Sequence, residues 1–152
     1  MSGAGELRER QQREARLDEE RPHHFALEDM VGELRDDPSY ETNGHTGLLL
    51  MKTDHLRVLL EVARAGEEIS QHSVHGPTVL HVLAGVLHVE DAGPPYVAGP
   101  GEMIVVPRDQ LRTLRAGHED AAFLWVLSLE TDRALAPRGV RQQLGRWTSE
   151  SR

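Results

Sequence analysis

Hydrophobic and polar positions follow two different periods along the chain. In the segment FALEDMVGELRDDP the apolar residues recur at the spacing of one helix face, at Leu27, Met30, Val31 and Leu34. This pattern predicts a short amphipathic helix that ends before Pro38. From residue 44 onward the apolar residues fall instead into short runs separated by turn residues, which is typical of strands.

The strand-like part begins with two apolar runs on either side of the polar Thr53-Asp54-His55, and this arrangement predicts a hairpin. Turn-rich stretches such as DAGPPYVAGPG and RAGHED separate the apolar runs that follow. Seven or eight short strands with hardly any helix between them indicate an antiparallel sandwich or barrel. The later strands are expected at about 78–83, 86–90, 103–106, 111–114 and 121–129.

The chain is polar at both ends, and this divides it into three expected parts. Residues 1–43 are predicted to hold a polar arm and the short helix, residues 44–130 the barrel, and residues 131–152 a tail. The arm has no apolar face to bury, so it is either a solvated extension or a segment that docks on a partner subunit. In the tail, Val140 and Trp147 are spaced for one side of a short helix.

Composition narrows the class of protein. The chain has 152 residues, of which 38% are hydrophobic and only 4% aromatic, so we expect one domain with an aliphatic core. It contains no cysteine, which excludes disulfides and thiolate metal sites. A net charge of −8 argues against nucleic acid as a partner. The sequence has no apolar run of membrane-spanning length and no signal region, so we expect no membrane association and a cytoplasmic location.

Three histidines lie close together in AGEEISQHSVHGPTVLHVLAG, at His72, His75 and His81. Neutral imidazole is the commonest protein ligand for transition metals, so this cluster raises the question of a metal site. Side chains alternate between the two faces of a strand, so His72 and Thr78 are expected on one face and His81 on the other. A β-bulge near His75 would turn the His75 side chain to the opposite face of the strand.

The spacing of glycines around this cluster resembles that of the cupin family. Gly66, His72 and Gly85 fit the frame of the first cupin motif, and Gly101 and Pro107 fit that of the second. The similarity covers roughly residues 44–130. It implies an all-β fold, a cupin-like double-stranded β-helix or jelly-roll barrel, here with a short N-terminal helical extension.

The resemblance also implies where a metal would be held. Cupins that bind a metal use four ligand positions, which fall here on His72, Val74, Thr78 and Arg112. Only His72 keeps a ligand, and Arg112 brings a permanent positive charge that repels a cation. We therefore expect no cofactor. A rearranged centre of His72 and His75 holding iron, zinc, nickel or manganese is the alternative.

The leading interpretation is a small cupin of unassigned activity with a degenerate metal site. A small anionic molecule would bind in the barrel through His72, Thr78 and Arg112, because a guanidinium pairs well with a carboxylate or phosphate. One alternative is a metal-dependent oxygenase or isomerase, and a second is a non-catalytic structural or regulatory dimer. A homodimer is expected in any case, because GLLLM is an apolar edge strand. No catalytic residue is assigned.

Overall fold

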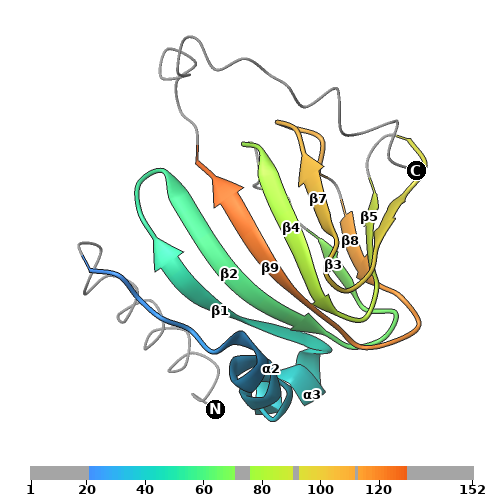
Figure 1. The fold of residues 1–152 in the computed structure, drawn as a ribbon. Coiled ribbons are helices and arrows are strands. Elements are labelled where there is room, and N and C mark those ends of the chain that lie inside the picture. Colours follow the sequence, from blue (N-terminus) through green and yellow to red (C-terminus); the bar gives the residue numbers. More distant parts are fainter. Residues whose placement is uncertain (1–20, 71–75, 91–92, 112, 130–152) are drawn as a thin grey trace.

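Two antiparallel sheets face each other in the structure, which is a computed structural model that describes residues 21–70, 76–90, 93–111 and 113–129. One sheet has five strands in the order β1-β2-β9-β4-β7, and the other has four in the order β3-β8-β5-β6 (Figure 1). The strands are β1 (His45–Lys52), β2 (Leu56–Ala63), β3 (Glu68–Ser70), β4 (Thr78–Ala84), β5 (Leu87–Glu90), β6 (Tyr96–Ala98), β7 (Met103–Val106), β8 (Thr113–Ala116) and β9 (Ala121–Ser128).

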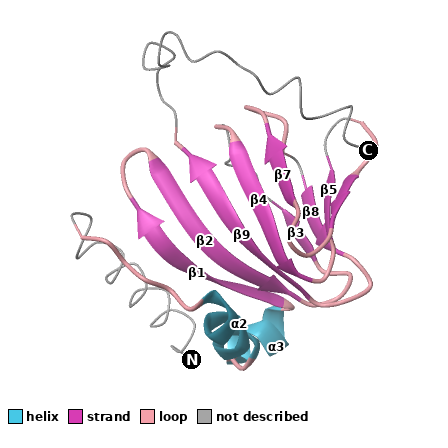
Figure 2. Cartoon of the chain, in the orientation of Figure 1, coloured by secondary structure: helices cyan, strands magenta, loops and turns pink. Residues whose placement is uncertain are grey.

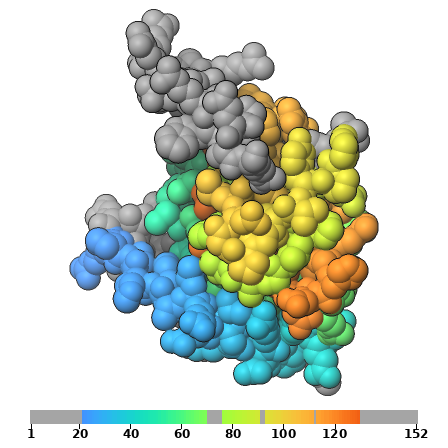
Figure 3. Space-filling view, turned by 45° about the vertical axis from the view of Figure 1, so that its right-hand side comes forward, coloured from blue at the N-terminus to red at the C-terminus, as the bar shows by residue number. Residues whose placement is uncertain are grey.

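Two short helices, α2 (Leu27–Arg35) and α3 (Pro38–Asn43), precede the strands. They lie at one end of the five-stranded sheet, beside β1 and β2 (Figure 2). The predicted apolar stripe of α2 is confirmed, because Val31 and Leu34 are buried against Leu60 and Val62 of β2. In the space-filling view these helices form a continuous layer of blue and cyan residues along the base of the molecule (Figure 3).

The second helix was not predicted. The sequence marks Pro38 as the end of the first helix, and that helix does end at Arg35. Pro38 then occupies the first turn of α3, where proline is tolerated because its missing N–H would have no partner there. The carboxylate of Asp37 accepts a hydrogen bond from the backbone N–H of Ser39 at 2.8 Å and caps the new helix.

The main core fills the space between the two sheets. On β9, Phe123, Trp125 and Leu127 are buried and alternate with less buried residues, as a strand with one inner face requires. They pack in a single cluster with Leu87 and Leu114 of the four-stranded sheet. The aliphatic core agrees with the sequence prediction.

Most predicted strands are present, with one shift and two omissions. The hairpin is β1 and β2, and the predicted segments at 78–83, 86–90, 103–106 and 121–129 correspond to β4, β5, β7 and β9. The strand predicted at 111–114 is wrong by two residues, because β8 starts at Thr113 and Leu111 packs into the core from the preceding connection. The short strands β3 and β6 were not predicted, since three residues carry too little periodicity.

β1 lies at the edge of the five-stranded sheet, where the sequence places it. Pairing of two copies through this edge stays a prediction. In the described part of the chain, the helices are too short and too polar to cross a membrane. The predicted arm at 1–20 and the tail at 131–152 lie outside the described residues.

Candidate functional site

Strand register brings a row of residues together on the inner face of the five-stranded sheet. Arg57 of β2 stands directly opposite Leu127 of β9, and Thr78 of β4 stands opposite the same leucine from the other side. Residues directly opposite each other point to the same face of a sheet. Leu127 belongs to the core between the sheets, so the side chains of Arg57 and Thr78 also belong to the inner face.

A second row lies next to the first. Trp125 is two residues from Leu127 on β9, and it stands between Leu59 of β2 and Leu80 of β4. Thr78 and Trp125 are therefore diagonal neighbours on adjacent strands, at a Cα separation of about 7–8 Å. Arg57 and Thr78 are two strands apart, or about 10 Å. These separations are spanned by a ligand of a few heavy atoms.

These rows lie near one end of the barrel, which we call the Thr78 end. β4 begins at Thr78, which pairs with Val106 at the end of β7 and with Leu127 near the end of β9. The connection 107–112 then leads from Val106 to the start of β8. Figure 1 shows β7 and β9 running toward this end, whereas α2 and α3 lie at the opposite one.

Thr78 and Trp125 carry polar atoms that are buried without a partner. Thr78 is 1% exposed and Trp125 is 2% exposed. Among the described residues, neither the Thr78 Oγ1 nor the Trp125 Nε1 has a hydrogen-bond partner. A buried polar group without a partner costs about 1–3 kcal/mol, so two of them side by side in a core require an explanation.

Arg57 adds charge to the same face. Its Nε atom is buried and makes no hydrogen bond to any described residue. Lys52 of β1 stands directly opposite Arg57, so two positive side chains share this corner of the sheet. Neither residue forms an ion pair with another described residue. Like charges placed opposite each other in a sheet repel, and an anion between them removes that repulsion.

One carboxylate, that of Glu61, also lies on the inner face, further along β2. Glu61 stands opposite Gly47 of β1 and Phe123 of β9. A Cβ atom on Gly47 would come within 2.5 Å of the Glu61 carboxyl group, so the glycine leaves room for that side chain. Glu61 has interactions of its own and is not a free carboxylate. It is four residues from Arg57 along an extended strand, or about 13 Å.

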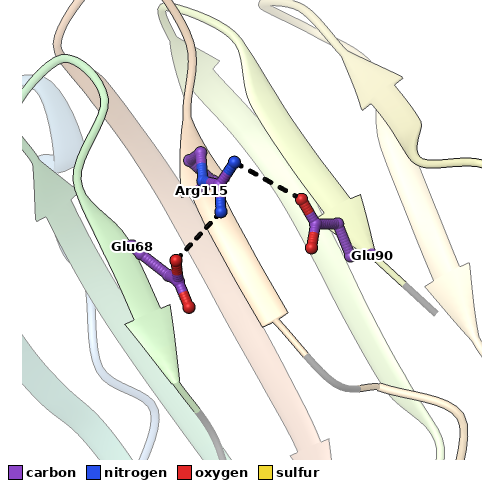
Figure 4. A network of polar contacts seen from close by, with 3 residues as sticks. All are labelled: Glu68, Glu90 and Arg115. Carbon is purple, nitrogen blue, oxygen red and sulfur yellow. Dashed lines mark hydrogen bonds and ion pairs between the residues drawn. The ribbon is translucent and has the colours of Figure 1, made fainter.

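On the outer face of the four-stranded sheet, by contrast, an arginine is paired with two glutamates. Arg115 of β8 lies between Glu68 of β3 and Glu90 of β5, with nitrogen-to-oxygen distances of 2.9 and 3.6 Å (Figure 4). All three side chains are at least 39% exposed. Exposed ion pairs of this kind add little to stability, so the trio is an ordinary solvated surface. Its arginine has acidic partners, whereas Arg57 has none among the residues that the structure describes.

Of the residues predicted to form the site, the structure describes Thr78 and places it on the inner face. His72, His75 and Arg112 lie outside the described residues. The predicted roles of these three residues stay predictions. His81 pairs with Met103 and Leu124 and faces outward, as its strand parity predicts.

The described inner face does not suit a metal ion. Among the described residues, no group of three or more histidine, aspartate or glutamate side chains could hold one. Thr78 stands at one of the four positions that the cupin resemblance assigns to metal ligands, and its hydroxyl is neutral. The polar atoms beside it belong to Trp125 and Arg57, which are hydrogen-bond donors and offer no lone pair to a cation.

Sequence reasoning missed two residues of this face. Arg57 lies in LRVLLEVA and Trp125 in AAFLWVLS, and both segments read as apolar runs. Strand parity was the available signal, because Arg57 and Glu61 share one face while Val58, Leu60 and Val62 share the other. Two opposite charges on one face of an otherwise apolar strand indicate an inner face with polar functions.

Comparison with known proteins tests the fold. No family model matches the chain, and no curated protein sequence matches it either. Solved structures do match. A conserved protein with a double-stranded β-helix domain from Klebsiella pneumoniae superposes with a TM-score of 0.57 at 20% identity, over 71% of this chain and 90% of that one. A cupin superfamily protein from Desulfitobacterium hafniense gives a TM-score of 0.53 at 19% identity, over 58% and 80% of the two chains.

The fold is that of the cupins. A cupin 2 conserved barrel domain protein from Leptotrichia buccalis agrees, with a TM-score of 0.52 at 23% identity over 55% of this chain and 40% of that one. The predicted cupin fold, with a short helical segment ahead of the strands, is thus confirmed. At these identities the likeness extends to the cupin fold and not to an activity.

Proposed function

We propose that this cupin barrel binds a small molecule at the Thr78 end and that its usual metal site is degenerate. The observation that carries the proposal is the pair of buried, unpartnered polar atoms, Thr78 Oγ1 and Trp125 Nε1. The Trp125 N–H can only donate, and the Thr78 hydroxyl can both donate and accept. A ligand with an acceptor oxygen between them satisfies both groups at once.

The surroundings indicate what else the ligand contains. Leu59, Leu80 and Leu127 flank the two polar residues on the inner face. Ligand sites in proteins combine such apolar walls with a few polar groups that fix the orientation of the ligand. The molecule is therefore expected to have a polar head and a short apolar body. From the sequence, His72 and Arg112 are proposed to contribute to the same site.

The experiment follows the indole N–H signals of the ¹⁵N-labelled protein by NMR. The chain has two tryptophans, so a Trp125→Phe variant assigns the Trp125 signal. Hexanoate and hexanamide serve as probes, because each places an acceptor oxygen on the same apolar chain. Saturable movement of the Trp125 signal by at least one probe, weakened about tenfold in Thr78→Val, supports the proposal.

A matched control uses Thr113→Val, which removes a hydroxyl from the outward-facing side of β8. That variant should bind the probes as the wild type does. If neither probe moves the Trp125 signal at millimolar concentration, or if Thr78→Val binds as well as the wild type, the barrel does not bind small molecules through these groups and the proposal is wrong.

A further inference from the structure

The inner face carries more unmet positive charge and more unmet donors than a neutral ligand would satisfy. Arg57 Nε and Trp125 Nε1 are buried donors for which the described part of the chain supplies no acceptor, and neither atom can itself accept a hydrogen bond. Lys52 adds a second positive charge opposite Arg57. Within the described inner face, the negative charge nearest to Arg57 along β2 is Glu61, about 13 Å away and already engaged.

We infer that Arg57 is the anion-recognition residue of the barrel and that the ligand is a small carboxylate with an apolar body. This inference rests on the proposed function and adds to it the chemical class of the ligand and the residue that selects it. Both carboxylate oxygens accept from the Arg57 guanidinium, and one of them also accepts from Thr78 or Trp125. Arg57 and Thr78 flank Leu127, so the head group lies over that leucine.

A carboxylate suits the position better than a phosphate ester does. A guanidinium pairs with the planar carboxylate through two parallel hydrogen bonds, and such charge-assisted bonds are about twice as strong as neutral ones. Beyond Arg57 and Lys52, the described walls are apolar, formed by Leu59, Leu80 and Val106. A doubly charged phosphate would leave oxygens against these walls without donors, at a high desolvation cost.

The structure also explains why Arg57 is not simply a surface arginine. Arg115 has the same side chain on the outer face, and it is bracketed by the carboxylates of Glu68 and Glu90 (Figure 4). Arg57 is held by strand register beside an apolar core instead, with its Nε removed from water. Arg115 therefore provides a control for the loss of one positive charge.

The test compares the affinities for hexanoate and hexanamide, which differ in charge but hardly in shape. The wild type should bind hexanoate at least about tenfold more tightly than hexanamide, because hydrogen bonds to charged groups exceed neutral ones by that margin. Arg57→Gln should abolish this preference while hexanamide binding remains. Arg57→Lys should keep part of the preference for hexanoate, because a lysine retains the positive charge but cannot form two parallel hydrogen bonds to a carboxylate.

Arg115→Gln should leave the preference unchanged, and thermal melting of each variant shows whether it is folded. Equal binding of the two probes by the wild type would overturn the inference and leave the proposed small-molecule function standing. A preference for hexanoate that persists in Arg57→Gln would also overturn it, because another residue would then select the carboxylate. If neither probe binds, both the inference and the proposed function are wrong.

Discussion

The guanidinium carbon of Arg64 lies 5.7 Å from the centre of the Tyr40 ring. The same side chain donates hydrogen bonds from Nη2 to the backbone carbonyls of Tyr40, at 2.8 Å, and of Glu41. Both carbonyls lie in α3, where the Tyr40 carbonyl also accepts a hydrogen bond from the backbone N–H of Gly44 at 2.9 Å. Arg64 therefore joins the end of β2 to α3 and fixes the helical layer on the sheet.

Removing this contact should loosen the helical layer. We expect Arg64→Ala to lower the free energy of unfolding by about 1–2 kcal/mol, because two hydrogen bonds and a cation–π contact are lost at a partly exposed site. Arg64→Lys should lose less, since a lysine keeps the charge over the ring. Urea unfolding followed by circular dichroism measures the difference. An alanine variant as stable as the wild type would contradict this role.

Tyr40 should make stability depend on alkaline pH. Burial raises the pKa of Tyr40 above its ordinary value of 10.0, and the negative charge of Asp120 raises it further, while Arg35 and Arg64 oppose these effects. The unfolded chain then loses the tyrosine proton at a lower pH than the folded chain. The contribution of Tyr40 to the free energy of unfolding is therefore fully present below pH 10. It is lost as the pH rises from there toward the raised pKa.

A Tyr40→Phe variant removes this contribution. Between pH 9 and 11 its free energy of unfolding should fall less steeply than that of the wild type, as urea unfolding at each pH would show. Identical slopes for the two proteins would mean that the Tyr40 hydroxyl ionises equally in both states, against the expectation from its burial.

Two glycines with the same backbone conformation should respond differently to substitution. Gly66 has φ +75° and Gly85 has φ +70°, a region that costs other residues about 1–2 kcal/mol. A Cβ atom on Gly66 would meet open space, whereas one on Gly85 would lie 2.3 Å from the backbone oxygen of Asp120. Gly66→Ala should therefore lose about 1–2 kcal/mol, and Gly85→Ala clearly more, in paired unfolding measurements. Equal losses would show that the Gly85 turn can move away.

The hydroxyl of Thr78, on the inner face, and that of Thr46, on the face toward the helices, provide a test in which the expected changes in stability are opposite. The Thr78 hydroxyl has no partner, so Thr78→Val should raise the free energy of unfolding by about 1 kcal/mol while it weakens ligand binding. The Thr46 Oγ1 accepts a hydrogen bond from Ser39 at 2.8 Å, so Thr46→Val should lower stability by about 1 kcal/mol. Thermal melting without ligand distinguishes them. If the Thr78→Val variant is less stable than the wild type, the Thr78 hydroxyl stabilises the fold, which contradicts this expectation.

Metal content tests the degenerate site. Untagged protein, purified without chelator and then loaded with iron, zinc, nickel or manganese, should hold no metal above trace by elemental mass spectrometry. The reason is that the described inner face offers donors and positive charge where a cation needs lone pairs. Nearly one metal per chain, lost in His72→Ala or His75→Ala, would contradict this expectation and support a rearranged histidine centre.

The fold was predictable because its signals are local. The helical spacing of Leu27 to Leu34 and the apolar runs of β1, β2 and β9 each lie within a few residues of sequence. Gly66, Gly85 and Gly101 all adopt positive φ, so the glycine frame seen in the sequence marks turns that require glycine. The three-residue strands escaped prediction because pairing with a neighbour defines them, not their own pattern.

The candidate site was predictable only in part. Thr78 was identified through the cupin frame, and its inward facing followed from strand parity. Arg57 was not, because its role depends on standing beside Leu127, a residue far away in the sequence. A pattern along one strand cannot show which distant strand will lie next to it.

The strand order has a consequence for synthesis of the protein on the ribosome. β9 is the last described strand in the chain, yet it lies between β2 and β4, where Leu56 pairs with Ser128 and Ala63 with Ala121. A nascent chain that has already made β1 and β2 cannot complete this sheet until residue 128 has left the exit tunnel. The apolar face of β2 stays open to other chains for that time, so folding is late and exposed to aggregation. Substitutions that slow the arrival of β9 should therefore reduce the yield of folded protein more than its stability.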